Sequence, residues 1–211
     1  ALWVDFASTF EDVATCQYKR VSDTCIEGYV QAKNVCGHGR YKLYFSLNTD
    51  QPFQLEEQKE TTACLTFGKK VRAVEVRIGL SALSSELASW ECARWEKMDF
   101  AELKSQTGNQ WEKQLSAIDV KGGKKDDKVI FYTSLYRAYL SPADVSSPDG
   151  AYLGTDGKVY ISEDFRYYSN WSLWDTFRTK FPLLVLTEPA RMRDMATSLI
   201  HLYATGKKDW S

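Results

Sequence analysis

The feature that most constrains the fold is a change in hydrophobic period near Leu83. In RYKLYFSLNT, residues 40–49, and in AVEVRIGLSAL, residues 73–83, apolar and polar side chains alternate, which is the period of a half-buried strand. After Leu83 the apolar residues recur every three or four positions, as in SSELASWECARWEKM. The chain is therefore predicted to be α+β, with antiparallel strands first and helices second.

The strand-rich half is predicted to be a sandwich. Glycine and asparagine breaks such as NVCGHG and LNTDQP separate its short runs. Short antiparallel strands with one wet face are typical of a β-sandwich. We expect residues 1–83 to form part of an N-terminal β-sandwich domain and residues 84–123 to form a helical linker. Residues 124–211 are expected to form a further, mainly helical region.

Three local signals place elements in this last region. Asp156-Gly157, between two short apolar runs, predicts a hairpin with a tight turn. Pro189 predicts the first turn of a final helix, which Gly206 is expected to end. Pro182 is expected to end or kink the helix that contains it.

The composition argues against several classes of partner. A net charge of -1 over 211 residues gives no bulk attraction to nucleic acid or to an anionic membrane. No apolar run approaches the roughly 20 residues of a membrane helix, and the first residues do not resemble a signal peptide. His38 and His201 have no neighbouring metal ligands in the sequence. We therefore expect no nucleic acid, no membrane and no metal ligands within this chain.

The cysteines and one sequon bear on the compartment. The candidates for disulfide formation, all in the strand-rich half, are Cys16, Cys25, Cys36 and Cys64. Their clustering among short strands favours at least one disulfide, and buried thiols in a reduced protein are the alternative. Asn170 begins an Asn-Trp-Ser sequon and is the candidate glycosylation site. Together these features favour a secreted or lumenal protein.

The segment SNWSLWDTFRTKFPLL, residues 169–184, is the most distinctive for function. It holds three large aromatic side chains within seven residues, Trp171, Trp174 and Phe177. Flat aromatic rings pack against the apolar faces of sugars, and carboxylates such as Asp175 accept hydrogen bonds from sugar hydroxyls. The segment is therefore a candidate carbohydrate-binding site.

A purely structural interpretation of the same segment stays open. Ser172 and Asp175 have the spacing of a capping box, in which Asp175 would stabilise a helix start. The spacing of Leu173, Phe177 and Leu184 predicts that these three side chains are core. From the residues alone, Asp175 is either a sugar ligand or a capping residue.

Longer motifs carry a family resemblance. FYTSLYRAYLSP, GAYLGTDGKVYIS and SLWDTFR follow one another in order within residues 131–206. The residues of these motifs and their spacing resemble those of glycoside hydrolase family 92, the calcium-dependent exo-acting α-mannosidases. IEGYVQ and YKLYFSLNTDQPF resemble the sandwich domain of that family more loosely. Ser147 is a departure, because the family often has an aspartate at this position.

The resemblance implies a fold and an activity. The family combines an N-terminal β-sandwich and a helical linker with an (α/α)6 barrel, so residues 124–211 would be the start of that barrel. The family hydrolyses terminal α-mannose with inversion, through a carboxylic acid and a carboxylate base. Calcium, a hard cation with oxygen ligands, is implied as a cofactor. Mannose-containing glycans and the remaining segments of the same enzyme are the implied partners.

The resemblance also implies which residues act. Trp174 and Asp175 match the part of the family pocket that binds the terminal mannose. The catalytic acid, the catalytic base and the calcium ligands are expected outside this chain, so the chain alone is expected to be inactive. Two alternatives remain. One is another (α/α)6-barrel glycosidase or phosphorylase of trehalase-like type, and the other is a non-catalytic carbohydrate-binding protein.

Overall fold

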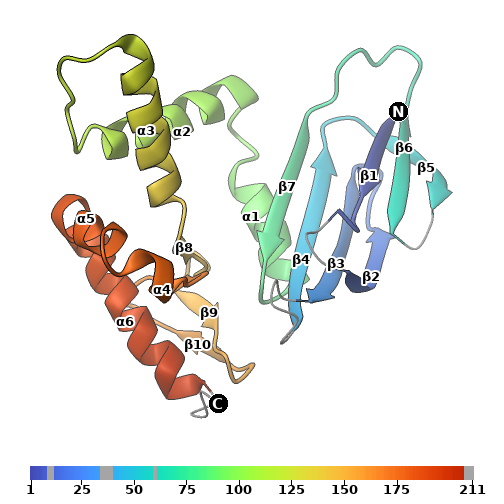
Figure 1. Cartoon of the computed structure of the whole chain (residues 1–211). Helices are drawn as coiled ribbons and strands as arrows, with labels where there is room; N and C mark the ends of the chain where they lie inside the picture. Colours follow the sequence, from blue (N-terminus) through green and yellow to red (C-terminus); the bar gives the residue numbers. More distant parts are fainter. Residues whose placement is uncertain (9–11, 34–39, 59–60, 207–211) are drawn as a thin grey trace. The chain divides into compact units, whose positions relative to one another are not determined.

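The computed structural model describes residues 1–8, 12–33, 40–58 and 61–206, and the chain divides into two compact units, Ala1–Phe100 and Ala101–Ser211. The elements of the first unit are β1 (Leu2–Asp5), β2 (Val13–Arg20), β3 (Cys25–Lys33), β4 (Arg40–Thr49), β5 (Phe53–Gln58), β6 (Thr62–Phe67), β7 (Val76–Ser81) and α1 (Ser85–Arg94) (Figure 1). The predicted succession of antiparallel strands and then helices is confirmed.

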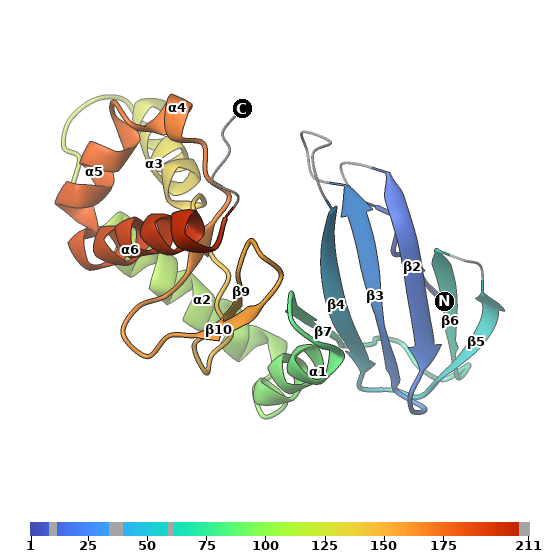
Figure 2. The ribbon, with the colours of Figure 1, turned by 90° about the horizontal axis from the view of Figure 1, so that it is seen from below.

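The first unit contains two antiparallel sheets. The larger sheet has the strand order β2-β3-β4-β7, and Figure 2 shows β2, β3 and β4 running side by side. The smaller sheet has the order β1-β6-β5. The pairing of β3 with β4 is unbroken from Cys25 opposite Asn48 to Lys33 opposite Arg40. This long register holds alternate side chains of both strands on the same two faces.

The core of this unit combines residues from both sheets, as expected of a sandwich. Its fully or nearly fully buried members are Cys16, Ile26, Val30, Phe45, Leu47, Phe53, Ala63 and Leu65. The alternation that was visible in the sequence of β4 places Phe45 and Leu47 in this core. The ring of Phe6 stacks on that of Phe45 with centroids 4.7 Å apart, which extends the core beyond β1.

Helix α1 packs on the larger sheet over β7 and β4. Ser84 caps the helix, because its side chain accepts a hydrogen bond of 3.2 Å from the backbone N–H of Leu87. The close approach depends on Gly79. A β-carbon at this position would lie 1.9 Å from the carbonyl oxygen of Ala88. Helix and strand backbones are therefore in direct contact, which no side chain at position 79 would allow.

Strand β7 is the terminal strand of the larger sheet. Ile78 lies opposite Leu47 and Leu80 lies opposite Phe45, so these side chains share the inner face of the sheet. Leu47 and Phe45 are buried, whereas Ile78 and Leu80 are 58% and 53% exposed. An apolar groove next to β1 therefore runs along this part of the inner face.

The second unit is mainly helical, as predicted. Its elements are α2 (Phe100–Leu115), α3 (Lys125–Tyr139), β8 (Ala143–Asp144), β9 (Ala151–Leu153), β10 (Val159–Ile161), β11 (Tyr168–Ser169), α4 (Leu173–Thr176), α5 (Lys180–Thr187) and α6 (Pro189–Thr205). Its buried core residues are Leu135, Tyr139, Tyr168, Leu184 and Met195. Strand β11 pairs with β8, and α6 packs against α5 and β11. The predicted linker, residues 84–123, is divided between the two units.

Several local predictions for the second unit are confirmed and one is wrong. Strands β9 and β10 form the hairpin around Gly157, which has a φ of 80°. Helix α6 begins at Pro189, with Gly206 as its C-cap. Pro182 neither ends nor kinks a helix, because it lies in the first turn of α5. The first backbone N–H groups of a helix have no intrahelical partner, so proline loses nothing there. None of the helices in the described part of the chain is long and apolar enough to cross a membrane.

The disulfide prediction fails for two of its candidates. Cys25 and Cys64 are buried free thiols, as is Cys92. The reason is their position. Cys25 lies opposite Asn48 in the larger sheet, and Cys64 lies opposite Trp3 in the smaller sheet.

The other two candidates have a different status. Cys16 is buried in β2, and Cys36 lies outside the described residues, so a disulfide that involves Cys36 stays a prediction.

Burial raises the pKa of the Cys25 thiol, and a contact with Ser46 partly opposes that rise.

Candidate functional site

The segment SLWDT forms a helix of a single turn. Helix α4 covers only Leu173–Thr176, and α5 follows after a short break. The Ser172 side chain makes no cap hydrogen bond to the backbone. Instead, its hydroxyl donates to Oδ2 of Asp175 at 2.5 Å. The hydroxyl of Thr176 donates to the carbonyl of Ser172 at 2.6 Å. The capping box is therefore replaced by a direct hydroxyl–carboxylate contact, which leaves Oδ1 of Asp175 without a hydrogen-bond partner among the described residues.

Exposure separates the aromatic residues of this segment into two kinds. Trp174 is 86% exposed, the highest value among the large hydrophobic side chains of the described residues. Trp171 instead packs against the core of the second unit, with its ring 6.4 Å from that of Phe181. Large exposed apolar side chains are the informative exceptions on a protein surface. Trp174 thus offers an exposed ring at the position before Asp175 in the same helical turn.

The prediction that Leu173 and Phe177 are core is wrong. Leu173 is 45% exposed and Phe177 is 52% exposed, whereas Leu184 is buried as predicted. The spacing argument assumed one continuous helix from Ser172. The chain instead breaks between α4 and α5, so these positions do not form one helical stripe.

Asn170 is the residue that connects β11 to this segment. It has a φ of 65°, in the left-handed region that asparagine tolerates better than most residues. The hydroxyl of Ser141 donates to its carbonyl oxygen at 2.9 Å. The Asn170 residue is exposed, so its side-chain amide lies on the surface where the sequon requires it.

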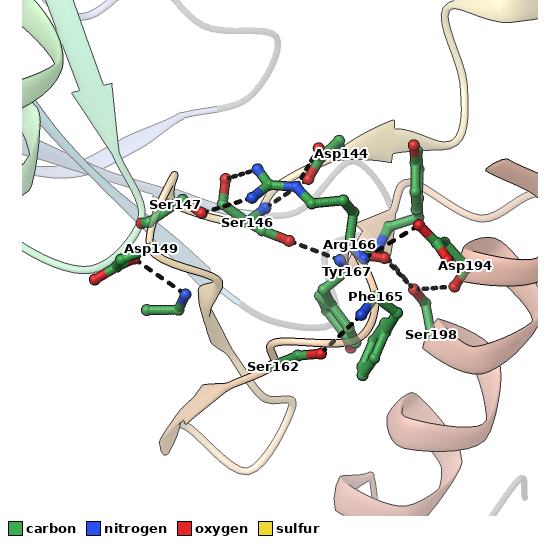
Figure 3. A network of polar contacts seen from close by, with 12 residues as sticks. Asp144, Ser146, Ser147, Asp149, Ser162, Phe165, Arg166, Tyr167, Asp194 and Ser198 are labelled. Atoms are coloured by element: carbon green, nitrogen blue, oxygen red, sulfur yellow. Dashed lines mark hydrogen bonds and ion pairs between the residues drawn. The ribbon is translucent and has the colours of Figure 1, made fainter. Parts of the chain in front are cut away.

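Arg166 organises the loop between β8 and β9. Its Nε donates to Oδ2 of Asp144 at 2.8 Å, and its two terminal nitrogens donate to the carbonyl oxygens of Ser147 and Ser146 at 2.9 and 2.8 Å (Figure 3). The backbone N–H of Tyr167 donates to the Ser146 hydroxyl at 2.6 Å. One guanidinium therefore ties the segment just before β11 to Asp144 of β8 and to two residues of the loop, using the planar fork of donors that only arginine has.

Ser198 on α6 bonds to the same segment and to the first residue of β11. Its hydroxyl is fully buried and accepts a hydrogen bond of 2.9 Å from the backbone N–H of Tyr168. The hydroxyl can donate to the carbonyl of Asp194 at 2.7 Å or to that of Arg166 at 3.2 Å (Figure 3). The Asp194 carboxylate accepts from the backbone N–H of Arg166 at 3.3 Å. Helix α6 thus fixes the strand that leads to Asn170 and the SLWDT segment.

This arrangement gives a stability prediction for Ser198→Ala. The substitution removes the acceptor of a buried N–H, which costs about 1–3 kcal/mol in the free energy of unfolding. Thr197→Ala is the matched control, because the Thr197 hydroxyl bonds only to the carbonyl of Arg193, one turn back on the same exposed helix face. We expect the control to change stability by less than about 0.5 kcal/mol. Urea unfolding of both variants measures the difference, and equal effects would contradict the assignment to Ser198.

An aromatic cluster supports the β9–β10 hairpin. The ring of Tyr152 stacks on that of Tyr167 with centroids 4.1 Å apart, and its hydroxyl lies 3.0 Å from Nδ1 of His201. Burial raises the pKa of the Tyr152 and Tyr167 hydroxyls, which therefore remain protonated at neutral pH. The role of His201 is structural, as a partner that joins α6 to the hairpin.

The described residues give no basis for assigning a metal or a catalytic pair. No group of three or more His, Cys, Asp or Glu residues within the described ranges is arranged to hold a metal ion. Asp144 and Asp194 are engaged in the hydrogen bonds described above.

Sequence reasoning proposed Trp174 and Asp175 as site residues, which stays a prediction, and it did not name the residues that hold their segment, among them Arg166 and Ser198. Ser198 bonds to a residue 30 positions away, and Arg166 bonds to residues 19 to 22 positions away. No periodicity or local motif signals contacts of this range. Only the fold brings these residues together.

Comparison with known proteins places this geometry in context. The family model of the glycosyl hydrolase family 92 catalytic domain matches residues 87–211. A solved family GH92 alpha-mannosidase of Bacteroides thetaiotaomicron, also solved with mannoimidazole, shares 24% identity with a TM-score of 0.86 over 97% of this chain. The family GH92 glycosyl hydrolase ccman5 shares 25% identity with a TM-score of 0.85 over 96% of this chain.

A third similar structure is a family GH92 inverting mannosidase of Bacteroides thetaiotaomicron, with 22% identity and a TM-score of 0.77 over 90% of this chain and 28% of that protein. This chain spans 30% of each of the first two structures. No curated protein sequence matches the chain significantly. The structural likenesses show a shared fold, in which strands of a sandwich precede helices of a barrel.

Proposed function

The chain belongs to glycosyl hydrolase family 92, and on that premise we propose that it is part of an exo-acting α-mannosidase that removes terminal α-mannose from glycans with inversion. Two of the similar solved structures are named as mannosidases, one of them inverting, which supports this substrate and outcome. The single observation in this chain that carries the proposal is the helical turn Leu173–Thr176, which holds the exposed Trp174 ring and the Asp175 carboxylate in consecutive positions.

In this proposal Trp174 and Asp175 bind the terminal mannose. The exposed ring of Trp174 packs against the apolar C–H face of the sugar. Asp175 accepts hydrogen bonds from sugar hydroxyls, since its Oδ1 has no protein donor among the described residues and a carboxylate is an acceptor only. The Ser172 hydroxyl occupies Oδ2 and so fixes the orientation of the carboxylate.

The chemical step is proposed to follow the inverting scheme. A carboxylic acid protonates the leaving oxygen, and a carboxylate base on the opposite face of the sugar activates water. We assign neither role to a described residue and expect both from other segments of the enzyme. Calcium dependence is part of the proposal, but no described residue is assigned as a calcium ligand and no step is derived through the ion.

A secreted or lumenal location, with a glycan on Asn170, is also proposed. The exposed turn at Asn170 supports it, whereas the free thiols of Cys25 and Cys64 remove part of the earlier reason for it. Mass spectrometry of the peptide that contains Asn170, from protein made in its native host, tests the glycan. An unmodified asparagine there would contradict the proposal.

The activity is tested with the whole enzyme and with the 211-residue chain in parallel. The whole enzyme should release mannose from an α-linked mannobiose, lose activity with a calcium chelator and recover it with added calcium. The chain alone should be inactive, since apolar side chains on α3, α5 and α6, such as Ile130, Leu186 and Ile200, are 64%, 81% and 68% exposed, as expected of helices that other segments cover.

The outcomes separate the alternatives. Release of glucose from trehalose, but no mannose from mannobiose, would favour a trehalase-like enzyme. Binding of mannobiose without hydrolysis by the whole protein would favour a carbohydrate-binding protein. Mannose release by the isolated chain would show that the catalytic acid and base lie within it.

A further inference from the structure

Arg191 on α6 connects three elements around the candidate site. Its Nη2 donates to the carbonyl oxygens of Tyr139 and Pro142 at 3.0 and 3.2 Å. Its guanidinium carbon lies 5.4 Å from the ring centroid of Tyr168, which is buried in β11. One side chain thus joins α6 to the turn at the end of α3 and to the strand that leads into the SLWDT segment.

Ser141 lies inside the turn that Arg191 holds. Its hydroxyl donates to the carbonyl of Asn170, 29 residues further along the chain. Asn170 is the left-handed residue between β11 and α4, so this bond fixes the direction in which the chain leaves β11. Arg191 therefore holds the turn, and the turn holds Asn170 through Ser141. Asn170 is followed directly by the segment that contains Trp174 and Asp175.

The charge of Arg191 is used differently from that of a surface arginine. Arg191 forms no ion pair with a carboxylate among the described residues, and its cation is held by two carbonyl oxygens and an aromatic face. Burial lowers the pKa of Lys180, and the positive charge of Arg191 adds to this effect.

We propose that Arg191 and Ser141 are positioning residues for the mannose-binding segment, residues 170–177. The inference rests on the proposed function, since the segment matters for catalysis only if Trp174 and Asp175 bind substrate. The helix α4 has a single turn and leaves Leu173 and Phe177 exposed, so its own packing cannot fix it. Its position then depends on what holds the chain before it, which is the packing of Trp171 and the bond from Ser141 to Asn170. A binding residue misplaced by about 1 Å can cost up to a hundredfold in rate.

The test uses four variants of the whole enzyme. Arg191→Lys keeps the charge but loses the planar fork that spans two carbonyls and stacks on Tyr168. Its control is Arg193→Lys on the same helix, where the side chain is 75% exposed and lies 3.7 Å from its neighbour Asp194. Ser141→Ala removes the hydroxyl that bonds Asn170, and Ser141→Thr restores a hydroxyl.

Two readouts are compared, kcat/KM on an α-mannoside and hydrogen exchange of the amides in residues 171–177. For Arg191→Lys and Ser141→Ala we expect kcat/KM to fall about tenfold to a hundredfold and exchange to accelerate. Arg193→Lys and Ser141→Thr should remain close to the parent enzyme in both. A purely structural role would lower the melting temperature but leave kcat/KM per folded molecule unchanged.

Each result decides the proposal. Unchanged exchange in both Arg191→Lys and Ser141→Ala would overturn it, and so would faster exchange with parental kcat/KM. If Arg191→Lys does not fold, the Ser141 pair alone gives the same comparison. A failure of the proposed function would appear elsewhere, as parental kinetics in a variant of Asp175, and is thereby distinguished from a failure of the positioning role.

Discussion

Replacing Asp175 with alanine in the whole enzyme is expected to lower kcat/KM for an α-mannoside by about 10- to 150-fold. The variant loses charge-assisted hydrogen bonds to sugar hydroxyls, which contribute roughly 1.5–3 kcal/mol. If these bonds strengthen as the sugar approaches the transition state, part of the loss falls on kcat. Steady-state kinetics and the melting temperature of the same preparation are the measurements.

The structural alternative for Asp175 predicts a different pattern. A residue that served only the helix start would cost about 1 kcal/mol of stability and leave the kinetics per folded molecule unchanged. Asp175→Asn keeps the shape and can still accept from Ser172, but it loses the charge. Ser172→Ala removes the contact at Oδ2 but leaves the carboxylate in place, so it should lower kcat/KM less than Asp175→Ala does. A lower melting temperature with unaltered kinetics in Asp175→Ala would exclude the sugar-binding role.

Gly79→Ala should destabilise the first unit by about 1–3 kcal/mol or more. The new methyl group would lie 1.9 Å from the carbonyl oxygen of Ala88 and 2.7 Å from the backbone nitrogen of Cys92. Both are backbone atoms, so no side-chain rotation relieves the clash and α1 must move away from β7. Urea unfolding followed by hydrogen exchange in β4 and α1 would show the loss and place it in this unit.

Gly108→Ala is the opposing control for the same chemical change. Gly108 lies within α2, and apart from the helix's own adjacent backbone an added β-carbon would meet no heavy atom of the described residues within 4 Å. Alanine is favoured over glycine inside a helix by about 1 kcal/mol, so this variant should become more stable. If Gly79→Ala were as stable as the parent, the close contact between α1 and β7 would be wrong.

Much of the fold follows from local rules in the sequence. The alternation in residues 40–49 predicts β4 and the face that Phe45 and Leu47 bury. Pro189 signals the start of α6, because proline has no backbone N–H to leave unpaired in the first turn, and Gly206 signals its end. These signals are reliable because their physical cause lies within a few residues of the feature.

The site was only partly predictable because its determinants are not local. The aromatic residues and Asp175 mark the segment, but the chain breaks between α4 and α5, and no local sequence signal marked that break. The expectation that Leu173 and Phe177 are buried failed for this reason. The disulfide expectation for Cys25 and Cys64 failed because sequence proximity says nothing about which sheet a strand joins.

The open edge of β7, the terminal strand of the larger sheet, has a consequence for handling the isolated chain. A terminal strand carries a row of backbone donors and acceptors along its open side, and it can template pairing with another molecule. In natural proteins, edge strands often carry lysine or proline, which disfavour such pairing. Strand β7 instead has exposed Ile78 and Leu80, and its one charged residue is Arg77. Self-association of the chain should therefore grow with concentration, and it should begin at this margin of the sheet rather than at the polar margin formed by β2.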